Sequence, residues 1–88
     1  MVTLIQEYST RVRAEDGTTY IVKACGGERS DGMWEGWLEF HPTDAGKAIV
    51  STGRETSQPN REAIDYWASG LEPIYFEGAF ARALGRLP

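Results

Sequence analysis

The first half of the chain alternates between apolar and polar side chains. Residues 8–14 show this alternation most clearly, and a period of two is typical of a strand that buries one face. The Asp16-Gly17 pair that follows is a strong hairpin signal. Residues 18–25, rich in Thr, Tyr, Ile and Val, are therefore predicted to return as a second strand.

Two further strands are predicted before the middle of the chain. Residues 26–32 contain three glycines and predict a flexible turn. A third strand then covers residues 33–41 and ends at Pro42, which cannot donate to a strand ladder. A short fourth strand within residues 47–52 completes an antiparallel meander.

The period changes from two to that of a helix after residue 60. Asn60 suits a helix N-cap, and Gly70 is placed where a helix would end on a residue with positive φ. Pro73 suits the first turn of a second helix, which we expect to run to about Arg86. The apolar positions that these helices should bury are Ala63, Ile64, Trp67, Leu71, Phe76, Phe80, Ala83, Leu84 and Leu87.

Together these patterns predict one α+β domain over residues 1–88. An antiparallel β-meander of three to four strands is followed by two C-terminal helices packed on one face of the sheet. In the third strand, Trp34, Leu38 and Phe40 should turn toward the helices. The second face of such a sheet stays open to solvent.

Trp37 should point to that open face. Ile21 and Met33 fall on the same side of their segments, so the three side chains form a candidate interface core rimmed by Arg and Glu. The alternative is that Trp37 only covers the stems of neighbouring charged side chains.

The second helix offers another candidate interface. Its non-core face is small and uncharged, which fits either close contact with a second subunit in a homodimer or a lightly exposed terminal helix. The residues of this face are Ile74, Gly78, Ala81 and Gly85.

The polar run of residues 51–60 is a candidate ligand site. Arg54 and Thr56, with the free N–H groups that follow Asn60, could hold an anion at the start of the helix. The alternative is an ordinary capped connection in which Arg54 pairs locally with Glu55.

Residue types that carry catalysis are scarce. The chain has one cysteine, Cys25, and one histidine, His41, so it lacks an intrachain disulfide and a set of zinc ligands. Glu35 and Glu39 lie on one face of a strand about 13 Å apart, too far to share a proton, and cross-strand pairing with Lys23, Arg11 or Arg13 is the simpler expectation. We expect no enzymatic activity, no metal and no cofactor.

The net charge of −4 argues against nucleic acid as a partner, because nucleic-acid binders carry a basic footprint. No apolar run approaches the roughly 20 residues that cross a bilayer, so we expect no membrane span, and the single cysteine fits a cytoplasmic location.

Three stretches resemble a group of small bacterial proteins without an assigned function: WEGWLEF at residues 34–40, TGRETSQPN at 52–60 and YWASGLEPIY at 66–75. The predicted order of elements is also similar to the fold of HicB-type antitoxins, which assemble as dimers or tetramers. We therefore expect a homo-oligomeric protein-binding or regulatory module, and the alternative is a small-ligand or anion-binding domain at residues 51–60.

Overall fold

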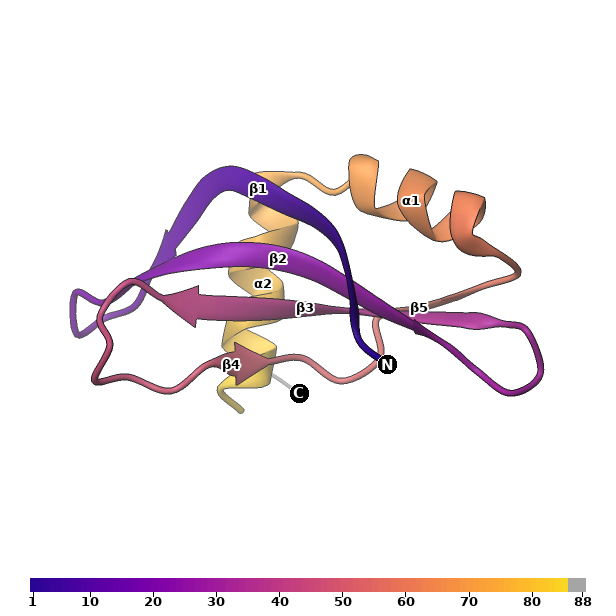
Figure 1. Cartoon of the computed structure of the whole chain (residues 1–88). Coiled ribbons are helices and arrows are strands. Elements are labelled where there is room, and N and C mark those ends of the chain that lie inside the picture. The colour runs from indigo at the N-terminus through magenta and orange to yellow at the C-terminus, as the bar shows by residue number, and fades with distance from the viewer. Residues whose placement is uncertain (86–88) are drawn as a thin grey trace.

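The computed structural model describes residues 1–85 and shows a five-stranded antiparallel sheet with two helices on one face (Figure 1). The strands follow the order β1-β2-β3-β4, and β5 pairs with β3 beyond β4. This confirms the predicted α+β meander. The elements are β1 (Thr3–Arg13), β2 (Thr19–Glu28), β3 (Trp34–Pro42), β4 (Val50–Ser51), β5 (Thr56–Gln58), α1 (Arg61–Ser69) and α2 (Pro73–Ala83).

The two long hairpins differ in how well their turns follow the glycine pattern. Gly17 has φ 88° in the turn between β1 and β2, as its place after Asp16 predicts. Gly26 and Gly27 were expected in the next turn, but both continue β2 and pair with β3. Gly26 has a packing reason to be there, because a Cβ would lie 3.1 Å from the Glu35 carbonyl oxygen.

Each edge of the sheet contains a segment with a surplus of two residues, and β1 has in addition a one-residue bulge between Leu4 and Gln6. In β1, residues 8–10 stand opposite Val22 alone, because Glu7 pairs with Lys23 and Arg11 with Ile21. On the other edge, residues 52–55 stand opposite only residues 37 and 38 of β3.

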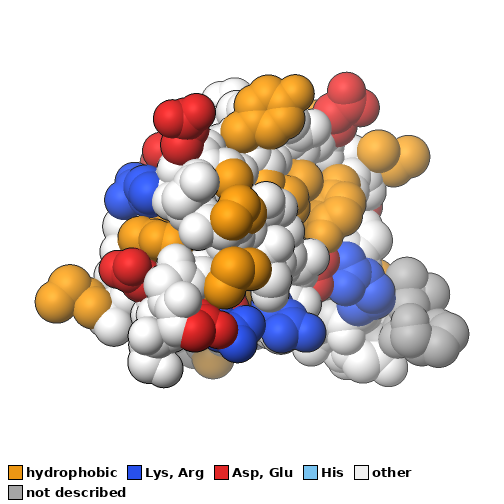
Figure 2. Space-filling view, turned by 90° about the vertical axis from the view of Figure 1, so that its right-hand side faces the viewer, with side chains coloured by type: hydrophobic (Ala, Val, Ile, Leu, Met, Phe, Trp, Pro, Cys, Tyr) orange, Lys and Arg blue, Asp and Glu red, His pale blue; other side chains and the backbone are white. Residues whose placement is uncertain are grey.

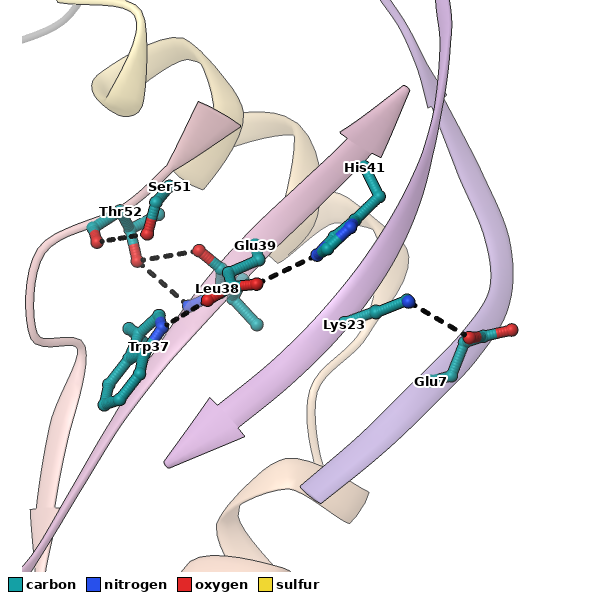
Figure 3. A network of polar contacts seen from close by, with 8 residues as sticks. All are labelled: Glu7, Lys23, Trp37, Leu38, Glu39, His41, Ser51 and Thr52. Atoms are coloured by element: carbon teal, nitrogen blue, oxygen red, sulfur yellow. Dashed lines mark hydrogen bonds and ion pairs between the residues drawn. The ribbon is translucent and has the colours of Figure 1, made fainter. Parts of the chain in front are cut away.

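Strands β4 and β5 are therefore two halves of one edge strand, and the run predicted to be a connection contains a strand. Thr52 holds the bulge between them closed, because its Oγ1 accepts a hydrogen bond from the Leu38 backbone N–H at 3.0 Å (Figure 3). The Glu55 backbone N–H then donates to the Gly36 carbonyl at 2.8 Å and restores the pairing.

The helices begin as predicted and end differently. Asn60 caps α1 with its side-chain oxygen 2.8 Å from the Ala63 backbone nitrogen, and Pro73 opens α2. Gly70 was expected at positive φ, but its φ is −91°, whereas Gly85, past the end of α2, has φ 77°. The predicted helix end at Arg86 and the core position Leu87 lie outside the described residues.

The core lies between the sheet and the helices. Its largest fully buried side chains are Val12, Val22, Leu38, Phe40, Ile64 and Phe76. Tyr8 connects β1 to both helices, because its ring lies 4.6 Å from that of Phe76 in α2 and its hydroxyl donates to the Ala68 carbonyl in α1 at 2.7 Å. Ala79 is buried where Leu84, predicted for the core, is 38% exposed, so the buried stripe of α2 is Phe76, Ala79 and Phe80.

Neither α1 nor α2 has the length and apolar composition that a helix needs to cross a bilayer, and residues 1–85 contain no further α-helix.

Candidate functional site: the open face of the sheet

The face of the sheet opposite the helices carries the candidate site. Leu38 and Phe40 of β3 are buried against the helices, so Trp37 and Glu39 between and beside them point to the open face. The cross-strand register arranges the side chains of this face in rows that run from β1 through β2 to β3.

One row is apolar and consists of Leu4, Cys25 and Trp37, which are neighbours in the register. Leu4 is 53% exposed, Trp37 is half-buried, and Cys25 between them is only 4% exposed. The Trp37 ring also reaches Gly27, where a Cβ would lie 3.7 Å from it. We call Leu4, Cys25 and Trp37 the apolar row.

The next row is charged and contains Glu7, Lys23 and Glu39 (Figure 3). Lys23 Nζ lies 3.8 Å from Glu7 Oε1. Glu39 accepts a hydrogen bond from Trp37 Nε1 at 3.0 Å, and its other oxygen lies 2.9 Å from His41 Nε2. The charged groups beside the apolar row are thus bonded to one another.

The position of Glu39 favours its ionised form. Burial raises the pKa of this carboxyl, but the hydrogen bonds from Trp37 and His41 lower it by more, so the net pKa is below its ordinary value. A charged Glu39 in turn keeps the Trp37 indole in a fixed orientation on the open face.

Cys25 is not placed to act as a nucleophile. Burial, followed by the charge of Glu39 and the hydrogen bond to it, raises the pKa of the Cys25 thiol to about 11. The thiol is therefore protonated at neutral pH, and the imidazole of His41 is bonded to Glu39. Among residues 1–85 there is also no group of three or more His, Cys, Asp or Glu side chains that could hold a metal ion.

The predicted interface residues of the sheet do not form one patch with Trp37. Ile21 is four positions from Cys25 along β2, and Met33 is four positions from Trp37, so each lies about 13 Å from the apolar row. Lys23 and Glu35 occupy the open face in between. Figure 2 views the end of the molecule that carries α1, β5 and the turn between β2 and β3, and there hydrophobic side chains are interspersed with polar and charged ones.

The predicted interface residues of α2 lie on its solvent side. Ile74 is 81% exposed, and a Cβ on Gly78 would meet no atom within 4 Å. Ala81 shares this helix, but Gly85 lies beyond its end, where the positive φ gives it a role in ending the helix.

The predicted anion-binding residues are already engaged within the chain. The Asn60 side-chain oxygen caps α1, and Thr56 Oγ1 accepts a hydrogen bond from Gln58 Nε2 at 2.7 Å. Arg54 lies 3.9 Å from Glu35, and Glu55 pairs with Arg82 at 2.8 Å instead of with Arg54.

Sequence reasoning missed the apolar row because Leu4 and Ile5 are adjacent apolar residues that break the alternation of β1. The one available signal was parity within β2, where Cys25 follows Ile21 and Lys23 on the open side.

A shallow polar hollow lies at the other end of the sheet, between the Asp16–Thr19 turn and the loop at Thr43–Lys47. Two of its charged groups form an ion pair with each other, because Lys47 Nζ lies 3.3 Å from Asp16 Oδ2. The backbone N–H of Thr18 donates to Asp16 and lowers the pKa of that carboxyl to about 2.

Comparison with protein-family models, with curated proteins and with solved structures finds no match to this chain. The resemblances noted from the sequence therefore stay predictions, and the case for function rests on the open face.

Proposed function

We propose that this chain is a homo-oligomeric, non-catalytic protein-binding module that docks partners on the open face of its sheet. The observation that carries the proposal is the apolar row. Leu4 and Trp37 present apolar surface with charged side chains in the rows on both sides of it.

An apolar centre within a polar rim is the usual anatomy of a protein–protein interface, and tryptophan is among the residues enriched there. The rim here is formed by Glu7 and Lys23 on one side and by Glu35 on the other. These groups are ion-paired, so they can stay hydrated at the edge of a contact while the apolar row is covered.

Trp37 is also held in place before any partner arrives. Its indole N–H is bonded to Glu39, which His41 positions from the other side (Figure 3). A side chain that is already ordered loses less conformational entropy on binding, and this favours affinity.

Photo-crosslinking in cells tests the proposal directly. A photoreactive amino acid at position 4 should yield discrete covalent adducts with a protein partner, because Leu4 is the most exposed member of the apolar row. The same amino acid at position 49 is the matched control, since Ile49 is similarly exposed at 55% but precedes β4, away from the apolar row.

Competition separates specific docking from chance contact. Excess unlabelled chain, or chain with Ile49→Glu, should abolish the adducts, whereas chain with Leu4→Glu should not. Equal adducts from positions 4 and 49, or equal competition by both variants, would contradict docking on the open face.

A further inference from the structure

Two arginines on the open face have no acidic partner. Among the cationic side chains of residues 1–85, Arg11 and Arg13 are the two without a carboxylate at ion-pair distance. Both are exposed and lie on the solvent side of β1, and the only bond of either guanidinium to another described residue is that of Arg11 to the Tyr8 carbonyl at 3.4 Å.

Acidic side chains without a partner flank an exposed apolar residue on α2. Glu72 and Glu77 are exposed and make no ion pair with the described residues, and Ile74 between them is 81% exposed. Because Phe76, Ala79 and Phe80 bury the other side of the helix, Ile74 and Glu77 point away from the sheet.

The two surfaces are complementary in charge. Arg11 and Arg13 are separated by about 6.7 Å along a strand, and Glu77 lies in the second turn of α2 with Glu72 at the N-cap position just before the helix. Ile21 is the register neighbour of Arg11 and offers an apolar contact for Ile74.

Two simpler ways to pair two copies of the chain are disfavoured, one by like charges and the other by the irregular edge of β1. Two α2 helices packed against each other would bring their Glu77 side chains together, and two β1 edges would have to pair across the surplus residues 8–10. Arg11 and Arg13 lie on the open face of the sheet, and Glu72, Ile74 and Glu77 lie on the helix side of the molecule. These charges can therefore form ion pairs only between different copies.

We propose that a second copy of this chain lies with its α2 across Arg11 and Arg13, which pair with its Glu72 and Glu77 while its Ile74 packs on Ile21. This rests on the proposed homo-oligomeric function and names the surfaces that form it. The contact is head-to-tail, so assembly continues beyond a dimer until it closes into a ring or extends as a chain.

Charge reversal tests the contact in both directions. Arg11→Glu with Arg13→Glu makes both surfaces acidic, and Glu72→Lys with Glu77→Lys makes both basic, so each variant alone should associate at least about tenfold more weakly than the native chain. An equimolar mixture of the two variants should recover assembly, because each then meets its opposite. Glu28→Lys with Glu62→Lys is the matched control, since both are exposed acids that form no ion pair within residues 1–85.

Sedimentation equilibrium over a hundredfold range of concentration provides the measurement. The mass of the native chain should exceed that of a dimer at about 20 mM salt and fall at about 0.5 M, where charges are screened within a few ångströms. Far-UV circular dichroism checks folding, and Arg13→Gln and Glu77→Gln serve as milder variants with the same expected direction.

The outcomes separate the two proposals. A native chain that is monomeric under all conditions overturns both this contact and the homo-oligomeric part of the proposed function. Association that persists in either reversed variant, or that the mixture fails to recover, overturns this contact alone.

Discussion

Gly36 determines how closely α1 approaches the sheet. A Cβ at this position would lie 2.9 Å from Thr56 Cγ2 and from the ring of Trp67, and 3.0 Å from Ile64 Cδ1. Distances below 3.0 Å force neighbouring atoms to move, so the absence of a side chain at Gly36 is what allows Trp67 and Ile64 to pack over β3.

Gly36→Ala should therefore lower the free energy of unfolding by about 1–3 kcal/mol, the usual cost of overpacking a core. Urea denaturation followed by circular dichroism measures it. Gly53→Ala is the control, because a Cβ there meets no atom within 4 Å and φ is not positive, and its effect should stay within about 0.5 kcal/mol. Equal effects of the two substitutions would contradict the packing described here.

The sequence could predict which face of the sheet each residue of β3 points to, but not which side chains would form hydrogen bonds or ion pairs with one another. Alternation alone places Trp37 and Glu39 on one face, and the structure agrees. Pairing of Glu39 with Trp37 and His41, and of Lys23 with Glu7, depends on side-chain reach across a twisted sheet, which period-two reasoning does not include.

At the scale of elements, Glu55 fastens α2 to the edge of the sheet. Its side chain is 7% exposed, and it accepts hydrogen bonds from both terminal nitrogens of Arg82 and from the Tyr75 hydroxyl. Burial opposes ionisation of Glu55, but the bond from Arg82 has the larger effect and holds the pKa of this carboxyl below its ordinary value.

The lowered pKa makes this link sensitive to acid. Its stabilisation is complete above the ordinary pKa of 4.5 and is lost as pH falls through the lower pKa of the folded state. Glu55→Gln should cost about 1–3 kcal/mol at pH 7, and its urea midpoint should fall less than that of the native chain between pH 6 and pH 3. Glu62→Gln, at an exposed site that has no ion pair in the described part of the chain, should follow the native curve, and parallel curves for all three proteins would contradict the link.

The elements that sequence reasoning missed share one property, which is that their sequences lack regular alternation of apolar and polar residues. β5 consists of Thr56, Ser57 and Gln58, three polar residues held by pairing to β3 alone. The first half of β1 lacks regular alternation because Ile5, which packs against the core, is an extra residue in a bulge between Leu4 and Gln6. The hairpin at Gly17 and the cap at Asn60 were predictable because their chemistry is local.

At the scale of the whole molecule, we expect β2 to be the last strand to separate from the sheet during unfolding. It is paired along most of its length to both β1 and β3, and the thiol of Cys25 is buried between Leu4 and Trp37. Partial openings at the short edge strands would leave this thiol covered, so its exposure reports loss of the sheet as a unit.

Cys25 should consequently react with an aromatic disulfide reagent at pH 8 only as fast as the sheet opens. Its pKa of about 11 leaves little thiolate in the folded state, and the side chain is 4% exposed. The rate should rise with urea in parallel with the unfolded fraction, and Leu4→Ala should accelerate it by uncovering the thiol. Rapid stoichiometric reaction without denaturant would show that Leu4 and Trp37 do not shield Cys25.

The interrupted edges of the sheet carry a consequence for how this chain can vary in length. The surpluses at residues 8–10 and 52–55 are each of two residues, and because side chains alternate with a period of two, residues beyond them return to the faces they would otherwise occupy. The single extra residue at Ile5 instead shifts the alternation of β1. Insertion or deletion of two residues such as Gly53 and Arg54 thus leaves each later side chain of the strand on the same face of the sheet. Insertion or deletion of one residue would move the later side chains, up to the next turn, to the opposite face.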